Sequence, residues 1–224
     1  SVTTGVQNTL IGGLAGDALT TGGDNVAVGY LALSAATAGY DNVAVGGEAL
    51  AANTGINNTA VGHKSAYTNT TGTQNSALGT YSLFANTEGD FNTAVGYTAL
   101  AANTTADNNT ALGHQALNAN TTGTAGTAVG KGALAANTTG NHNVSIGEDA
   151  LAANVTAHRA TAVGYQALKA SNVSGNSNSA NTAVGFQAGT AMTTGLANTL
   201  VGALAGDAIT TGGFNTAVGY QSLT

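Results

Sequence analysis

The chain repeats one short sequence pattern thirteen times. Each copy opens with Asn-Thr-Ala-Val-Gly or a close variant, continues through a variable pair to Ala-Leu, and closes with a polar turn. The copies start at Asn8, Asn25, Asn42, Asn58, Asn75, Asn92, Asn109, Gly126, Asn143, Ala160, Asn181, Asn198 and Asn215. Successive starts lie 17 residues apart, except for one spacing of 16 and one of 21. This period predicts a solenoid, because a coil this small cannot bury its own apolar face and must stack on its neighbours.

The composition is typical of an ordered repeat and not of a disordered chain. Charged residues make up 6% of the sequence, against roughly 25% in typical soluble proteins. Disordered chains are usually highly charged and poor in β-branched residues, whereas Val, Thr and Ile recur here at fixed positions. We therefore predict that residues 1–224 form a single all-β solenoid domain. Because the sequence begins and ends inside a repeat, we expect this domain to be a fragment of a longer fibre.

Several functional classes are disfavoured by what the sequence contains. Ten acidic residues outweigh four basic ones, which gives a net charge of −6 and no basic stripe for nucleic acid. We find no apolar run long enough to insert in a membrane and no signal peptide. The chain has no Cys, and its four His residues do not pair at ligand spacing. We expect no catalytic residues, no metal and no cofactor, and therefore not an enzyme.

The columns of the repeat predict how a coil packs. Counting each coil from its starting residue as position 0, position 3 is Val, Ile or Leu in all thirteen coils, and position 1 is Thr or Val apart from one Ser. Alternate residues of a strand share a face, so we predict that positions 1 and 3 form the core of the coil. Position 8 is Leu in nine coils and is predicted to be a second core position, on a return strand.

The opposite strand face carries small residues. Position 2 is Ala in ten coils, and position 4 is Gly in all thirteen. One interpretation is a strip that lets another chain approach closely, and the alternative is that Gly only permits a bend. The glycines that represent this predicted interchain strip are Gly29, Gly46, Gly96, Gly113 and Gly164.

The polar turn carries an Asn at position 11 of seven successive coils, from Asn53 to Asn154. Aligned Asn side chains can hydrogen-bond along a stack of strands, so this column predicts a ladder. Asn103 and Asn120 also lie in Asn-x-Thr glycosylation sequons. The ladder accounts for these Asn residues, so no glycan is needed to explain them. We also predict that the Gly that follows most of these Asn supplies the positive φ that a tight turn requires.

Two features are candidates for recognition. Position 5 varies more than any other strand position and holds aromatic or imidazole rings that could contact a receptor or a second chain, with strand-edge cover as the alternative. The rings selected as candidates are Tyr30, Tyr97, His114, Tyr165, Phe186 and Tyr220. The 21-residue coil carries its extra residues between Lys169 and Ser179, which predicts a bulged surface loop that serves either recognition or no function.

The columns resemble a known family. The pattern Asn-Thr-Ala-Val-Gly-Tyr-x-Ala-Leu, followed by Asn-Thr-Thr-Gly, is similar to the head repeats of trimeric autotransporter adhesins (the YadA-like head). It is more similar still to the repeats of bacteriophage tail fibres, and this resemblance covers essentially the whole chain. The resemblance implies a left-handed parallel β-roll, with three chains side by side in a homotrimer.

The repeat and the resemblance together predict a structural and adhesive fibre shaft. It would belong to a phage tail fibre or a bacterial surface adhesin, and would lie on the virion or at the cell surface. Its partners would be further copies of itself and a cell-surface glycan or protein receptor. One alternative is a carbohydrate- or matrix-binding adhesin head. Another is an ice-binding solenoid, which the Thr column at position 1 favours and its expected inward orientation disfavours.

Overall fold

The computed structural model describes residues 3–175 and 177–224 and divides into two compact units, Ser1–Asn109 and Thr110–Thr224. Every coil contributes one strand of three residues, which occupies positions 1 to 3. The remaining described residues form turns, bends and irregular segments, and no helix occurs among them. The predicted all-β solenoid of about thirteen coils is confirmed. The return strand that we expected around position 8 is absent, because that part of each coil is a series of turns.

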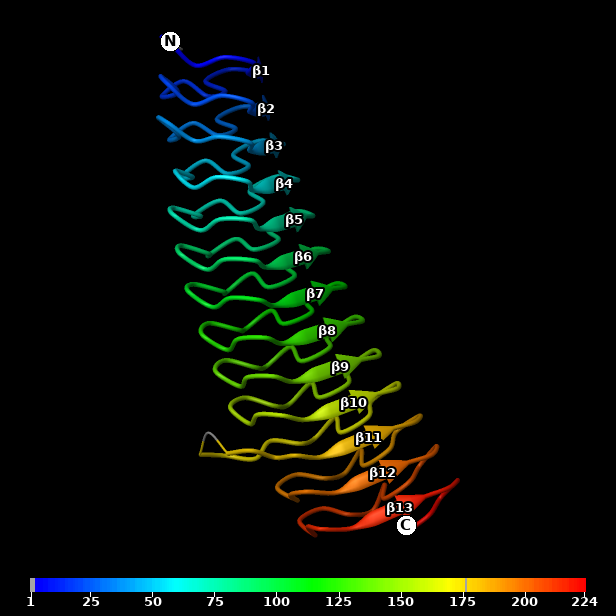
Figure 1. Cartoon of the computed structure of the whole chain (residues 1–224). Helices are drawn as coiled ribbons and strands as arrows, with labels where there is room; N and C mark the ends of the chain where they lie inside the picture. The colour runs from blue at the N-terminus through cyan, green and yellow to red at the C-terminus, as the bar shows by residue number, and fades with distance from the viewer. Residues whose placement is uncertain (1–2, 176) are drawn as a thin grey trace. The chain divides into compact units, whose positions relative to one another are not determined.

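The first unit is a parallel sheet whose strands follow the order of the sequence (Figure 1). Neighbouring strands pair without any shift in register, as in Ala27 opposite Ala44. Equivalent side chains therefore stack in columns. The strands of this unit are β1 (Thr9–Ile11), β2 (Val26–Val28), β3 (Val43–Val45), β4 (Thr59–Val61), β5 (Ser76–Leu78) and β6 (Thr93–Val95).

The second unit repeats this arrangement. Its strands are β7 (Thr110–Leu112), β8 (Thr127–Val129), β9 (Val144–Ile146), β10 (Thr161–Val163), β11 (Thr182–Val184), β12 (Thr199–Val201) and β13 (Thr216–Val218). The 21-residue coil leaves the register intact, because Thr161 still pairs with Thr182. Its extra residues lie outside the strands, and an isolated parallel bridge joins His158 to Asn178. Position 176 of the predicted Lys169–Ser179 loop lies outside the described residues.

The two faces of the strand are the reverse of our sequence-based prediction. The Ala residues at position 2, such as Ala94 and Ala128, are completely buried inside the coil. Positions 1 and 3 point outward and are half-buried or exposed. In every strand except β1, the middle residue is buried and the residues on either side of it are not. The prediction that the Val and Thr columns form the core is therefore wrong.

Interior volume explains this reversal. Leu at position 8 is fully buried, as at Leu100 and Leu117, and the interior also holds the Asn columns described below. Little space remains for position 2, and a methyl group fills it. Where position 2 is Leu, position 8 is Gly: a Cβ added to Gly16 would lie 2.8 Å from Leu10, and one added to Gly206 would lie 2.8 Å from Leu200. In coils one and twelve the larger side chain at position 2 thus takes the space that Leu at position 8 fills in most other coils.

The glycine column at position 4 has a role within the chain. Each of Gly29, Gly46, Gly96, Gly113 and Gly164 has a φ between +130° and +140°. A Cβ added to Gly29 would lie 2.5 Å from the carbonyl oxygen of Gly46 in the next coil. The close approach that we predicted at these glycines thus occurs between coils of one chain. An interchain contact at the same glycines stays a prediction.

Candidate functional site

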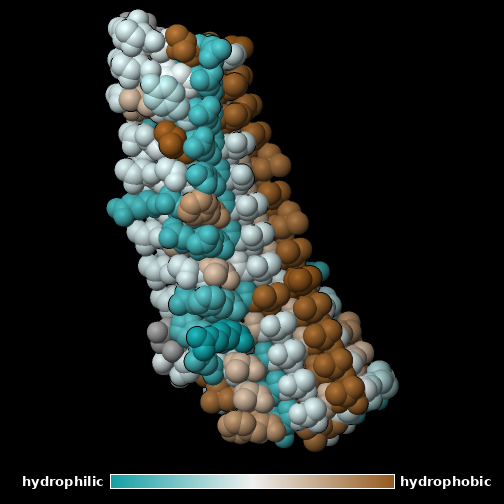
Figure 2. All heavy atoms as spheres, in the orientation of Figure 1, coloured by the Kyte–Doolittle hydropathy of each residue, from teal (hydrophilic) through white to brown (hydrophobic). Residues whose placement is uncertain are grey.

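The most extensive exposed feature is the side of the sheet formed by positions 1 and 3, which we call the outward strand face. Position 3 supplies a column of Val, Ile and Leu side chains, and the exposed fraction is 59% at Ile11, 50% at Leu78 and 69% at Val218. Brown spheres follow the strand side of each unit in Figure 2. None of the thirteen residues at position 3 and none of those at position 1 is charged. This face is therefore a neutral, largely aliphatic surface.

The hydroxyl groups of the outward strand face differ from those of the turns. Turn Thr residues donate to the next coil, as Thr70 Oγ1 does to the carbonyl of Thr87 at 2.8 Å. In the described part of the chain, no such bond to a protein acceptor is found for the Thr and Ser hydroxyls at position 1, whereas Ser145, at the inward position 2, donates to the carbonyl of Ala150 at 2.7 Å. The hydroxyls at position 1 are consequently available to water or to a partner.

The Asn ladder predicted in the turn is confirmed. In the first unit, the side-chain amide of Asn69 donates to Asn53 Oδ1 at 2.6 Å, and Asn86 and Asn103 continue the series at 2.6 and 2.7 Å. In the second unit, Asn137 donates to Asn120 at 2.8 Å and Asn154 donates to Asn137 at 3.0 Å. All these side chains are buried. Burial of Asn103 and Asn120 fits a structural role for the two sequons.

A second buried ladder at position 0 was not predicted. The backbone N–H of Asn42 donates to Asn25 Oδ1 at 3.0 Å, and its side-chain amide donates to the carbonyl of Gly55 at 3.0 Å. The same backbone-to-side-chain bond recurs from Asn58 to Asn42 at 3.0 Å. The near-constant Asn at the start of each coil was the signal for this ladder. Both ladders satisfy most of their buried polar groups and connect successive coils, although the buried Oδ1 of Asn154, at the end of the turn ladder, accepts no hydrogen bond.

We expect Asn86→Leu to lower the free energy of unfolding by about 3 kcal/mol, because it leaves buried polar partners unpaired. The side chain of Asn86 bonds to Asn69 Oδ1, to the carbonyl of Gly89 and to the amide of Asn103. Leu is an apolar residue of similar size, and coil one carries Leu19 at this position. Urea unfolding measures the change. Glu88→Thr, an exposed substitution in the same turn, is the control and should leave the midpoint unchanged.

The candidate rings at position 5 are all exposed. The exposed fraction is 58% at Tyr30 and 51% at Phe186, and Tyr97, His114, Tyr165 and Tyr220 are exposed as well. The structure brings two of them together in the second unit, where Tyr165 and Phe186 stack with centroids 5.4 Å apart and planes 14° apart. Residues without rings interrupt the column at Gly47, Thr80, Lys131, Glu148 and Ala203, so it is not one continuous stack.

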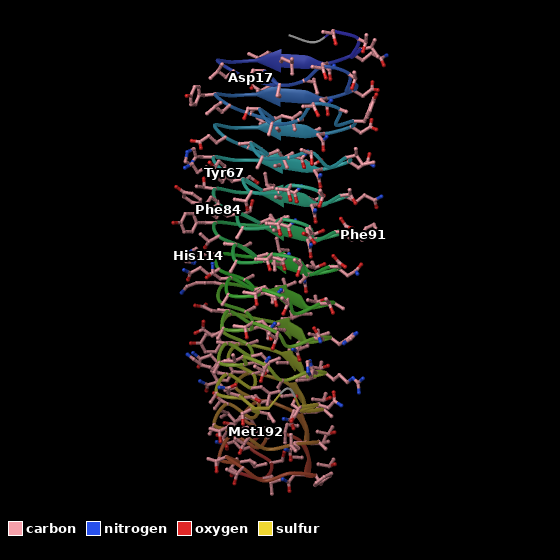
Figure 3. All side chains as sticks on the ribbon, turned by 90° about the vertical axis from the view of Figure 1, so that its left-hand side faces the viewer. Asp17, Tyr67, Phe84, Phe91, His114 and Met192 are labelled. Atoms are coloured by element: carbon pink, nitrogen blue, oxygen red, sulfur yellow. The ribbon has the colours of Figure 1, made fainter. Side chains whose placement is uncertain are left out.

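The first unit contains an aromatic cluster that sequence reasoning missed. It consists of His63, Tyr67, Tyr81, Phe84 and Tyr97, from coils four to six. Tyr67 and Phe84 stack at 5.4 Å with planes 8° apart, and Tyr81 meets Phe84 edge to face at 5.5 Å. In Figure 3, Tyr67 and Phe84 lie on one side of the ribbon and Phe91 on the other. The signal was at position 9, where rings occur only in coils four and five.

The three Lys residues are paired with acids from neighbouring coils. Lys64 lies 3.6 Å from Glu48 and 5.2 Å from the centroid of the Tyr67 ring. Lys131 lies 3.1 Å from Glu148, and Lys169 lies 3.1 Å from Asp149. The hydrogen bond to Glu148, followed by its charge, raises the pKa of Lys131. Ion pairs at the surface add little stability, but these pairs neutralise the surface locally.

The described residues present no enclosed chemical site. No cavity or cleft was found there, and no three His, Cys, Asp or Glu side chains gather closely enough to hold a metal ion. His158 has a structural role, because its Nδ1 accepts the backbone N–H of Asn141 at 2.8 Å. In the same part of the chain, no helix is long and apolar enough to cross a membrane. Comparison with known proteins found no matching family model, no matching curated protein and no matching solved structure.

Proposed function

We propose that this chain is the shaft of a fibre, in which copies of the chain meet through the outward strand face. The fibre belongs to a phage tail fibre or a bacterial surface adhesin, and holds or contributes to host or receptor attachment at the virion or cell surface. The left-handed roll and the number of three chains rest on the sequence resemblance. The role of the shaft is mechanical, because strand pairing acts along it and packing between chains acts across it.

The observation that carries the proposal is the outward-facing aliphatic column at position 3, whose side chains are half-buried or exposed. It recurs on every strand of both units and includes no charge. Monomeric soluble proteins rarely expose contiguous apolar patches of more than a few hundred Å². Removing Val, Ile and Leu side chains from water is favourable by roughly 25 cal/mol per Å², so association of this face with its own copy is stabilising.

The outward strand face is smaller than a typical stable interface, so residues outside the strands would also contribute to contact between chains. With three-residue strands about 10 Å long and spaced about 4.8 Å apart, the strand faces of the two units together cover roughly 600 Å². Stable interfaces bury about 800 Å² on each partner. The stacked rings Tyr165 and Phe186 at position 5, two residues beyond the aliphatic column, would add to this area.

Sedimentation equilibrium tests the proposal. We expect a multiple of the 21.5 kDa chain mass, and three chains if the resemblance holds. A folded chain that sediments as a monomer at micromolar concentration contradicts the fibre shaft.

One observation favours a second candidate, an ice-binding solenoid. We had disfavoured it because the Thr column was expected to point inward, and position 1 in fact points outward with free hydroxyls. However, position 3 mixes Leu78, Leu112 and Ile146 with Val, so the face is uneven. A monomer that shows thermal hysteresis and loses it in Thr127→Lys would favour this candidate. An oligomer without thermal hysteresis would favour the shaft.

A further inference from the structure

The aromatic cluster of coils four to six is not needed to build the coil. Position 9 is Tyr67 or Phe84 in the cluster, but it is Ala101 in the next coil and Ala135 two coils later. The backbone bond at this position is the same with either kind of side chain. Thr68 N donates to the carbonyl of Phe84 at 3.1 Å, and Ala85 N donates to that of Ala101 at 2.9 Å. The rings therefore add to the surface without being required by the fold.

The cluster presents both apolar and polar groups. His63 and Tyr97 occupy the same column two coils apart, and each lies perpendicular to Tyr81, at centroid distances of 5.6 and 6.4 Å. Both are exposed, whereas Tyr67, Tyr81 and Phe84 are half-buried. The five rings thus comprise three phenols, one imidazole and one phenyl ring. The pairing of Lys64 with Glu48 at 3.6 Å keeps this part of the surface close to neutral.

We propose that this aromatic cluster binds a neutral carbohydrate. The inference rests on the adhesive part of the proposed function and assigns a place to it. A sugar ring carries C–H groups that pack against an aromatic face, and hydroxyls that exchange hydrogen bonds with phenol and imidazole groups. The occupant is a hexose-based glycan or polysaccharide whose chain lies across neighbouring coils.

Other partners fit the same surface less well. A peptide that adds a strand needs an open sheet edge, but β4 is paired with both β3 and β5, and β5 with both β4 and β6. A peptide that binds in a groove needs a cleft, and none was found among the described residues. A charged polymer needs an unbalanced charge, which the Lys64–Glu48 pair removes. A neutral, hydroxyl-rich ligand has none of these requirements.

The test replaces four rings with residues that the same columns carry elsewhere in the chain. Tyr67→Ala and Phe84→Ala introduce the residue that Ala101 represents in the same column. Tyr81→Gln likewise copies Gln115, and Tyr97→Thr copies Thr80. The matched control removes two exposed rings outside the cluster through Tyr30→Thr and Phe91→Asn. The Asn copies Asn108, which occupies the same column as Phe91 in the next coil. Because each substitution copies a residue that another coil carries in that column, both variants should fold.

Affinity electrophoresis through gels that contain galactomannan, xyloglucan, mannan or dextran measures binding. We expect at least one of these polysaccharides to retard the wild-type chain. The four-ring variant should lose about tenfold or more in affinity, while the control changes by no more than about twofold. The inference is overturned if none of the four polysaccharides retards the wild-type chain, or if the four-ring variant is retarded equally.

Sedimentation of the same samples separates this inference from the fibre shaft. A four-ring variant that keeps the wild-type mass while it loses polysaccharide binding supports the inference. If that variant becomes monomeric, the cluster contacts a second copy of the chain and the inference is overturned. If the wild-type chain is monomeric yet binds polysaccharide through the cluster, the shaft is refuted and the inference stands.

Discussion

Replacing Val129 and Val163 with lysine is expected to separate the assembled chain into folded monomers. Both side chains belong to the outward strand face of the second unit and are half-buried in the single chain. In one chain the new ammonium groups would reach water, so the coil should keep its structure. Between two copies they would be buried without a partner, which is costly. Sedimentation equilibrium should give the 21.5 kDa chain mass, with a circular dichroism spectrum like that of the wild type.

The control for this prediction is the double variant Val129→Thr and Val163→Thr. Thr is uncharged and β-branched, and it already occupies position 1 of the same strands. This variant should stay associated, with some loss of affinity. If the double lysine variant sediments like the wild-type protein, the outward strand face does not contact another copy.

Gly46→Ala is expected to lower the free energy of unfolding by about 4 kcal/mol, which is a large effect for the addition of one methyl group. Gly46 has a φ of +132°, where residues with a Cβ are strained. The added Cβ would lie 2.5 Å from the carbonyl oxygen of Gly62 in the next coil, so one backbone must move away from the other. Separation of two coils disturbs the ladder bonds on both sides. Urea unfolding of the full chain measures the effect.

The adjacent glycine is the matched control. A Cβ added to Gly47 would meet only His63 Cδ2, at an ordinary contact distance of 3.5 Å. Gly47→Ala should therefore leave the unfolding midpoint unchanged or raise it slightly, because it restricts the unfolded chain. Equal midpoints for the two alanine variants would contradict the close stacking of coils at position 4.

Much of the fold could be predicted from the period alone. The coil boundaries, the strand at positions 1 to 3 and the Asn ladder from Asn53 to Asn154 follow from which residues recur. The strand alternation defines two faces, but it does not say which of them is inside. The interior volume decides which face is inside. The sequence shows this in coil one, where Leu10 and Gly16 replace the usual Ala at position 2 and Leu at position 8.

The turn around position 8 was misassigned for a related reason. Leu at this position has a positive φ, such as 49° at Leu50 and 52° at Leu100, which costs roughly 1–2 kcal/mol per residue. Burial of the Leu side chain offsets this cost. The column offered a hint, since position 8 holds Leu, Ala or Gly and never a β-branched residue. An apolar column alone cannot distinguish a strand from such a turn.

The candidate sites were predicted in part. The rings at position 5 are exposed, as expected for a position whose residue type varies from coil to coil. The aromatic cluster could not be found in the same way, because it joins positions 5, 6 and 9 of different coils. Tyr67 and Phe84 are exceptions within their column, and only the stacking of coils shows that they contact each other and that Phe84 contacts Tyr81.

Cross-linking through a single cysteine tests most directly whether copies of the chain meet at the outward strand face. The protein has no native Cys, so Val129→Cys introduces one outward thiol per chain, and Ala128→Cys introduces one buried inside the coil. With a short bismaleimide, we expect Val129→Cys to give a covalent dimer of about 43 kDa, twice the 21.5 kDa chain mass, and Ala128→Cys to stay unmodified. If the thiol of Val129→Cys reacts but every chain stays at 21.5 kDa, copies do not meet at this face.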